Sequence, residues 1–209
     1  MNINLIFPNQ LFEESTILEN SNTTFLIEEY LFFNQYKFHK QKILFHRDSM
    51  INYYSYLKGK GKNVKYINSF DNESDVRVFL KNIKIKEINI YNPVDNWLEK
   101  RIISSCLKEK ININIHENPL FLTKKSELIP FFSPTKKKLF QTSFYKNQRI
   151  KFSVLLDNEN KPEGGKWTYD DLNRKKYPKN KHTPIIDYTF LNSKSHNDSL
   201  KYVSKYFSK

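Results

Sequence analysis

The chain has 209 residues and a formal net charge of +13, from 35 Lys and Arg against 22 Asp and Glu. This length suits one domain of ordinary size with an additional segment. A single cysteine, Cys106, excludes an internal disulfide and a metal or cluster site made of four thiolates from this chain. No apolar run reaches the roughly 18 residues of a membrane span, and no charged region precedes the first apolar stretch, as a signal peptide requires. We therefore expect a cytoplasmic protein without a membrane partner.

The basic charge by itself is a weak sign of nucleic-acid binding. Only five of the 35 cationic residues are arginine, and the chain is rich in Asn, Lys, Ile, Phe and Tyr, as AT-rich codons produce. Arginine is the residue suited to bidentate phosphate and base contacts. Codon bias therefore explains part of the charge.

Five short β-rich runs alternate with longer helical patterns through the first 116 residues. A repeated strand–helix–strand order favours right-handed crossovers and a parallel sheet covered by helices on both faces. The sequence therefore predicts an α/β fold with a Rossmann-like, doubly wound, five-stranded parallel sheet. The expected strands are residues 3–7, 23–27, 63–67, 87–91 and 112–116.

Three segments between these strands have helical spacing. Residues 35–59 place Tyr36, His39, Ile43, His46 and Met50 at intervals of three and four. Residues 73–83 follow an Asp-Asn cap signal, and residues 93–110 are expected to open at Pro93. Because Cys106 shares a stripe with Leu98 and Ile102, we expect a buried thiol rather than a reactive one.

The alternation stops after residue 116, which suggests a division of the chain. We expect an α/β domain over residues 1–132, a basic helical segment over 133–156 and a linker rich in Asn, Lys and Pro over 157–195. Residues 196–209 have helical spacing but are too short to fold alone.

Ligands of doubly wound sheets bind at the carboxyl ends of the strands. The candidates here are residues 8–11 after the first strand and 28–33 after the second, and no glycine-rich phosphate loop is present. Of His39 and His46, one could line a ligand pocket at the helix start, but ordinary positions at the helix–sheet boundary are favoured. Without a nearby carboxylate at metal spacing, the two give only a weak zinc signal. Residues 141–152 interleave aromatic and cationic side chains, which fits either a helix packed on a core or a surface that stacks bases. No arrangement of serine, histidine and acid predicts nucleophilic catalysis.

Six blocks in the sequence resemble the N-terminal part of deoxyribodipyrimidine photolyase-related proteins. This is the iron–sulfur bacterial branch of the cryptochrome/photolyase family, which contains prokaryotic (6-4) photolyases. The resemblance runs from residue 1 to about 190 and covers the following blocks in order: PNQLF, EEYLFFNQYKFHKQKILFHRDSM, NPVDNWLEKR, ENPLFLT, TSFYKNQR and KPEGGKWTYDDLNRK. The block containing GGKW is the most specific.

The resemblance implies that residues 1–132 are an antenna domain that binds a light-collecting chromophore, 6,7-dimethyl-8-ribityllumazine or another antenna molecule. It implies pocket positions after the first two strands and on the following helix. These positions are Asn9, Gln10, Ile27, Glu28, Phe32, Gln35 and His46.

The resemblance also implies that the glycine pair Gly164 and Gly165 lies in a segment leading to a helical domain, of which residues 196–209 would be the start. Adjacent glycines let a backbone approach packed surface closely. The tethers of this segment would be Trp167, Asp170, Asn173 and Arg174.

In the family, FAD, the iron–sulfur cluster and the DNA-contacting face belong to the C-terminal half. The resemblance therefore implies a truncated or split protein with no catalytic or metal-binding residues of its own. Its partner would be a separately encoded C-terminal photolyase half, and it would reach DNA only through that half. The alternative is a stand-alone module that binds a small molecule or nucleic acid, the latter through residues 136–182.

Overall fold

A computed structural model describes residues 1–169, 175–188 and 193–207. The chain divides into two compact units, which are described separately. Unit 1 comprises residues 1–120 together with 187–209, and unit 2 comprises residues 121–186.

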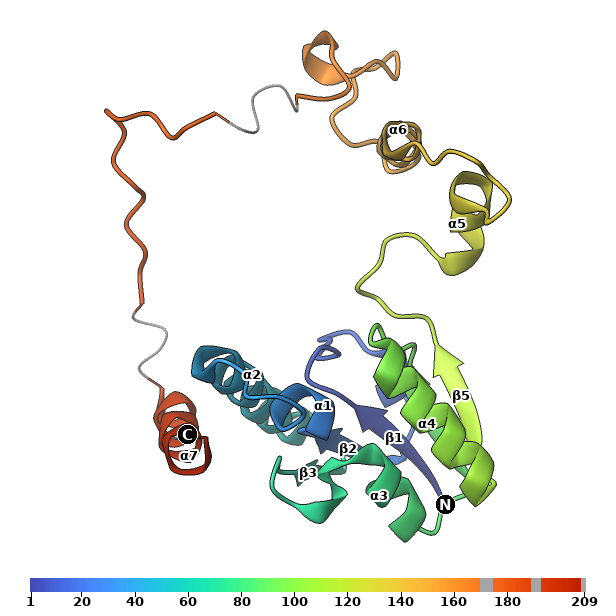
Figure 1. Cartoon of the computed structure of the whole chain (residues 1–209), viewed down its shortest axis with the longest axis vertical. Coiled ribbons are helices and arrows are strands. Elements are labelled where there is room, and N and C mark those ends of the chain that lie inside the picture. Colours follow the sequence, from blue (N-terminus) through green and yellow to red (C-terminus); the bar gives the residue numbers. More distant parts are fainter. Residues whose placement is uncertain (170–174, 189–192, 208–209) are drawn as a thin grey trace. The chain divides into compact units, whose positions relative to one another are not determined.

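Unit 1 is built on a five-stranded parallel sheet in the order β3-β2-β1-β4-β5 (Figure 1). The order reverses beside β1, so the switch point of the sheet lies between β1 and β4. The predicted sheet and fold class are confirmed, with every strand within one residue of its expected position. The strands are β1 (Asn2–Ile6), β2 (Thr23–Ile27), β3 (Val64–Ile67), β4 (Glu87–Tyr91) and β5 (Asn112–His116).

Two apolar clusters cover the two faces of this sheet. On one face, α3 (Val76–Asn82) and α4 (Asn96–Glu109) pack on the side chains of β1 and β4. On the other face lies α2 (Lys40–Gly59), whose Ile43 and Met50 are buried beside β2. Short 3-10 turns at Thr16–Leu18 and Asn72–Ser74 and the single-turn helix α1 (Tyr30–Phe33) complete the connections. The two clusters give unit 1 a core on both sides of the sheet.

Three predicted helix starts were wrong, and side-chain caps explain them. The expected helix over 73–83 begins at Val76, because the Asp75 side chain accepts a hydrogen bond from the Arg77 N–H. The expected helix over 35–59 begins only at Lys40, because the His39 side chain accepts a hydrogen bond from the Gln41 N–H. The expected helix over 93–110 begins at Asn96 rather than at Pro93, because Asp95 caps two N–H groups of the first turn. A cap satisfies N–H groups that would otherwise have no partner, and so fixes where a helix begins.

The C-terminal helix α7 (Lys194–Tyr206) packs against α2 within unit 1. Its Val203 side chain is buried in the same cluster as the α2 side chains. His196 Nδ1 lies 2.9 Å from Asp48 Oδ2, and Ser195 donates a hydrogen bond to Asn52 at 2.9 Å. Apolar and polar contacts therefore hold a short helix that could not be stable alone.

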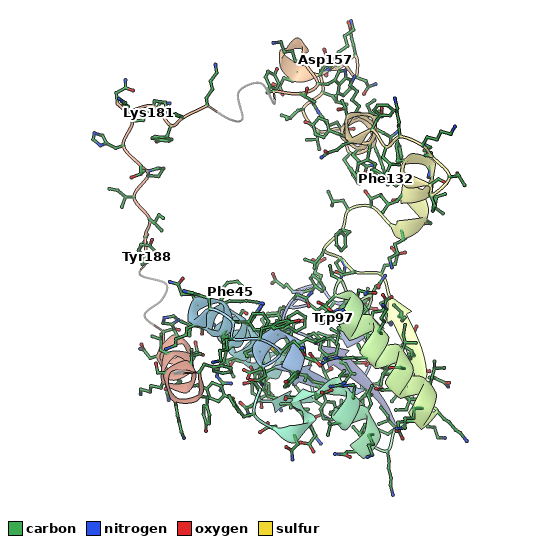
Figure 2. All side chains as sticks on the ribbon, viewed as in Figure 1. Phe45, Trp97, Phe132, Asp157, Lys181 and Tyr188 are labelled. Atoms are coloured by element: carbon green, nitrogen blue, oxygen red, sulfur yellow. The ribbon has the colours of Figure 1, made fainter. Side chains whose placement is uncertain are left out.

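Unit 2 contains α5 (Lys125–Phe132), α6 (Gln141–Lys151) and a 3-10 turn at Glu163–Gly165. In its described part no apolar side chain is buried, and the one buried residue is Arg149. Figure 2 shows the side chains of this unit, among them the labelled Phe132, which is 37% exposed. Within the described residues of the whole chain, no helix has the length and apolar character needed to cross a membrane.

Candidate functional site

The end of β2 leads into two consecutive buried carboxyl groups, Glu28 and Glu29. Glu28 faces α2, whereas Glu29 faces α3 and α4. A buried carboxylate is costly unless it is paired or hydrogen-bonded. The partners of these two groups therefore define what the carboxyl edge of the sheet can do.

Glu28 is fully engaged within unit 1. Its Oε1 accepts from Arg47 Nη1 at 2.7 Å and from the Tyr66 hydroxyl at 2.6 Å, and its Oε2 accepts from the Ser69 N–H at 2.8 Å. The Tyr202 ring of α7 covers Arg47, with its centroid 3.4 Å from the guanidinium carbon. Burial and the neighbouring Glu28 raise the pKa of Tyr66 well above its usual value. Glu28, one of the pocket positions that the resemblance implies, is thus hydrogen-bonded on both carboxylate oxygens by groups of unit 1.

Glu29 links the starts of two helices. Its Oε2 accepts from the Leu31 N–H of α1 at 2.5 Å, and its Oε1 accepts from the Val76 N–H of α3 at 3.4 Å. Arg101 Nη1 lies 3.9 Å from the same Oε1. Burial raises the pKa of Glu29 to about 7, although both backbone hydrogen bonds and Arg101 act to lower it. The carboxyl group therefore titrates near neutral pH while capping two helices.

Gln10 spans the switch point between β1 and β4. Its Nε2 donates to the Tyr91 carbonyl at 3.3 Å, and its Oε1 accepts from the Phe7 N–H at 3.4 Å. The side chain is fully buried. Asn9 beside it has a buried Oδ1 with no hydrogen-bond donor in the described part of the chain. Gln10 therefore bridges β1 and β4 at the place where doubly wound sheets usually hold a ligand.

His46 of α2 lies beside three aromatic rings, two from α1 and one from α2. Its ring centroid is 6.0 Å from Phe32, 6.1 Å from Phe33 and 6.2 Å from Phe45. Burial, and to a smaller extent Lys42, lowers the pKa of His46 to about 4, so the imidazole is neutral at physiological pH. Its buried Nδ1 has no partner among the described residues. This imidazole packs as an aromatic ring.

The structure brings together only part of the predicted pocket. Phe32 and His46 are in ring contact, whereas Gln10 turns to β4 and Gln35 Oε1 accepts from Arg101 of α4 at 3.1 Å. Ile27 is a fully buried core residue. Gln10 and Glu28 are hydrogen-bonded within unit 1, whereas the buried Asn9 Oδ1 and His46 Nδ1 have no partner among the described residues. The antenna chromophore stays a prediction of the resemblance.

Arg149 organises unit 2 from within. Its guanidinium donates to the carbonyls of Val154 and Trp167, each at 3.1 Å, and to the carbonyl of Leu155. Its Cζ lies 5.2 Å from the Trp167 ring centroid and 5.7 Å from that of Tyr145. The side chain is 5% exposed. Arg149 therefore ties α6 to the segment with the glycine pair and is not a free phosphate ligand.

The glycine pair makes a turn that other residues would strain. Gly164 and Gly165 both have φ +75°, in the left-handed region that favours glycine. A Cβ at Gly164 would lie 2.4 Å from the Tyr169 hydroxyl oxygen. That hydroxyl donates to the Gly164 carbonyl at 3.2 Å. The turn is thus built around Tyr169, while the predicted tethers Asp170, Asn173 and Arg174 lie outside the described residues.

Sequence reasoning missed Arg47, Arg149 and Tyr202 as the residues that hold these sites together. The arginines could have been singled out from the sequence, because only five of the 35 cationic residues are arginine. All four described arginines bond an acid, an amide or carbonyl groups. Planar guanidinium groups suit such buried multidentate contacts, and lysine does not replace them. Nothing in the sequence indicated that the Tyr202 ring would lie over the Arg47 guanidinium.

The described residues offer little reactive chemistry. They contain no group of three or more His, Cys, Asp and Glu side chains that could hold a metal ion. Cys106 is fully buried, as predicted, and burial raises the pKa of its thiol to about 11. The thiol is therefore protonated at neutral pH and is neither a nucleophile nor a ligand.

The fold defines unit 1 as a Rossmann-like α/β domain with a filled switch point. The family model described as deoxyribodipyrimidine photo-lyase-related protein matches residues 4–209, and the chain belongs to this family. The chain is 35% identical over 188 residues to the uncharacterized protein R852 of Acanthamoeba polyphaga mimivirus, covering 85% of this chain and 95% of that protein.

A second similarity is to the (6-4) photolyase of Agrobacterium fabrum. The identity is 26% over 142 residues, which is 65% of this chain. The match spans only 28% of the length of that photolyase. For this chain, the activity of the whole enzyme is therefore only a proposal.

Proposed function

We propose that this chain is the N-terminal, antenna-type part of a light-dependent DNA repair assembly of the photolyase family. In this proposal it is not catalytic alone, and a helical half encoded as a separate chain supplies the flavin, the iron–sulfur cluster and the DNA contacts. Family membership and the similarity to a (6-4) photolyase support the class of reaction. The fold of unit 1 supports the antenna-type role.

The observation that carries the proposal is the composition of the surface of unit 2. A unit that buries none of its described apolar side chains lacks the core that normally stabilises a fold. Large exposed apolar patches mark interaction sites. The exposed side chains are Phe121, Leu122, Ile129, Phe132, Leu139, Phe140, Tyr145, Ile150, Phe152, Val154, Leu155, Tyr169, Tyr177, Ile185 and Ile186.

The chain's own residues would prepare this surface for a partner. Arg149 fixes the carbonyls of Val154, Leu155 and Trp167, so the segment after α6 is held in one conformation before docking. Preorganisation of this kind lowers the entropy cost of association. A helical partner would then cover the exposed aromatic rings.

The test expresses this chain with the photolyase-related helical half encoded in the same genome. We expect a stable complex that repairs ultraviolet-damaged DNA under blue light, and no repair by this chain alone. Phe140→Asp should weaken the complex at least 10-fold, because Phe140 is 65% exposed on unit 2. The matched control Phe45→Asp changes a ring that is 70% exposed on α2 of unit 1, and it should have no effect. A genome without such a helical half, or repair by the purified chain alone, would contradict the proposal.

A second candidate function is a stand-alone nucleic-acid-binding module. Residues 121–186 hold 15 of the 35 Lys and Arg but six of the 22 Asp and Glu, and so carry +9 of the net charge of +13. Exposed aromatic rings beside cations suit single-stranded nucleic acid.

The two candidates differ in what the isolated chain binds. The module predicts salt-sensitive binding of single-stranded DNA by the chain alone, with log K falling linearly with log salt concentration. Replacing Lys136, Lys137 and Lys138 by alanine should reduce that slope. The assembly predicts only weak DNA binding until the helical half is added.

A further inference from the structure

A pocket of about 590 Å³ opens in unit 1 beneath the end of α7. Its walls come from the connection between α1 and α2, from the loop after β3 and from the last residues of helix α7 and beyond. Pockets of 300–1,000 Å³ are typical of small-molecule sites. Of the seven positions implied by the family resemblance, only Gln35 lines it.

Six aromatic rings make up most of the pocket wall. Phe70 packs against Tyr206 at 5.0 Å and against Phe207 at 5.1 Å between ring centroids, and Tyr36 lies 5.9 Å from Phe38. Tyr36 is 57% exposed and Phe70 is 51% exposed. These rings therefore offer uncovered faces, on which a flat ring can stack. The six rings are Phe33, Tyr36, Phe38, Phe70, Tyr206 and Phe207.

The charged groups of the pocket have one sign. Lys37 and Lys205 line it, and no Asp or Glu does. Within the described chain, neither lysine has a carboxylate at ion-pair distance. Two unpaired ammonium groups beside aromatic walls attract an anionic group.

Two amide side chains at the pocket are held in fixed orientations. Gln35 Oε1 accepts from Arg101, which leaves the Nε2 group as a donor. Asn34 Nδ2 donates to the Ser69 carbonyl at 2.6 Å, which leaves Oδ1 as an acceptor. A fixed donor and a fixed acceptor are what a heteroaromatic ring edge requires.

We propose that this pocket binds a planar heteroaromatic molecule that carries an anionic group, of which a nucleoside monophosphate is the simplest representative. The ring stacks between Tyr36 and the Phe70–Tyr206 pair, and the anion is held by Lys37 and Lys205. The site lies wholly within unit 1 and does not depend on a helical partner. Because Lys205 and Tyr206 belong to the last turn of α7 and Phe207 caps it, an occupied pocket also holds that helix in place.

The test titrates the full chain with two fluorescent probes, 1,N6-ethenoadenosine monophosphate and 1,N6-ethenoadenosine, and follows anisotropy. We expect saturable binding of both, at least 10-fold tighter for the monophosphate at low salt. Tyr36→Ala and Phe70→Ala should each weaken both probes. Lys37→Ala combined with Lys205→Ala should remove the difference between the probes. All four positions are exposed, and circular dichroism checks the fold of each variant.

A matched control lowers the net charge equally at another place. Lys81 and Lys84 line a separate groove beside Met1, and their double alanine variant should bind both probes as the parent does. Absence of saturable binding up to 1 mM would overturn the proposal. So would equal affinity for the two probes, equal loss in the control variant, or binding that ignores Tyr36→Ala and Phe70→Ala.

A second readout follows the helix rather than the probe. The monophosphate should slow hydrogen exchange in α7, and it should do so in the Lys81→Ala/Lys84→Ala control as well. Unchanged exchange in α7 at saturating probe would contradict the assigned position of the ligand. Both readouts concern the isolated chain, so they stand or fall independently of the proposed repair assembly.

Discussion

Units 1 and 2 of this chain differ in what they bury. Every buried apolar side chain of the described residues belongs to unit 1, where two clusters flank a parallel sheet. In the described part of unit 2 the one buried side chain is the guanidinium of Arg149. The first unit therefore has the core of an independent domain, whereas the second is organised by polar contacts around one cation and leaves large apolar side chains exposed.

The comparison also shows how arginine is used in a lysine-rich chain. In unit 1, Arg47 and Arg101 accompany the buried carboxyl groups of Glu28 and Glu29. In unit 2, Arg149 bonds three carbonyls, and Phe144 is in ring contact with Phe131 and Phe132. Both units thus depend on planar, multidentate cations, but only unit 1 combines them with apolar burial.

The largest expected effect comes from breaking the cation–carboxylate pair in unit 1. Arg47→Ala leaves Glu28 buried without its charged partner, which should lower the free energy of unfolding by about 3–5 kcal/mol. Urea denaturation measures the change. The control Lys58→Ala removes the same charge from an exposed position of α2 and should change stability by less than about 0.5 kcal/mol. Equal effects of the two variants would mean that burial of this pair is not what stabilises unit 1.

The next effect sharpens the contrast by acting on unit 2 alone. Arg149→Ala removes the three carbonyl contacts, so residues 154–169 should become sensitive to limited proteolysis while the urea midpoint of unit 1 stays unchanged. Lys146→Ala, on the same helix, removes an equal charge whose Nζ lies 5.7 Å from the Trp167 ring centroid, so its effect on the digestion pattern should be much smaller. A shift of the unit 1 midpoint in Arg149→Ala would show that the two units are not independent.

The smallest effect concerns pH and the neutral His46. Because its pKa of about 4 in the folded protein lies below the usual histidine value of 6.5, its contribution to stability is lost as the pH falls from 6.5 toward 4. Glu29, whose pKa is raised to about 7, acts in the opposite direction and stabilises the fold as the pH falls from 7 toward 4.5.

His46→Leu removes only the first of these two contributions. Relative to the parent, the variant should gain on the order of 1 kcal/mol in the free energy of unfolding between pH 7 and pH 4.5, allowing for partial solvent screening. Urea denaturation at the two pH values measures this difference. A variant that loses stability relative to the parent on acidification would contradict a neutral, desolvated imidazole.

The sheet could be predicted from the sequence because its signal is local. Short β-rich runs, such as residues 23–27 and 87–91, alternate along the chain with segments of helical spacing. This order alone favours a parallel sheet. The helix starts were missed because caps at His39 and Asp95 depend on single side-chain hydrogen bonds. The hydrophobic periodicity of a sequence does not reveal such bonds.

The candidate site was less predictable because its contacts are distant in sequence. Glu28 was identified as a polar group at the sheet edge, but its partners Arg47, Tyr66 and Ser69 come from α2, β3 and the following loop. The docking of Tyr202 onto Arg47 joins residues more than 150 positions apart in the chain. The pattern of α7 showed that it has an apolar face, but not which surface would cover it.

The central claim is that unit 1 folds by itself while unit 2 presents a surface for a helical partner. Hydrogen exchange followed by mass spectrometry, on the chain alone and with the photolyase-related helical half, tests it most directly. The account predicts strong protection in β1, β2 and β4 in both samples, and protection of residues 121–169 that rises at least 10-fold only when the partner is present. Residues 121–169 protected as strongly as the sheet in the isolated chain, and unchanged by the partner, would contradict it.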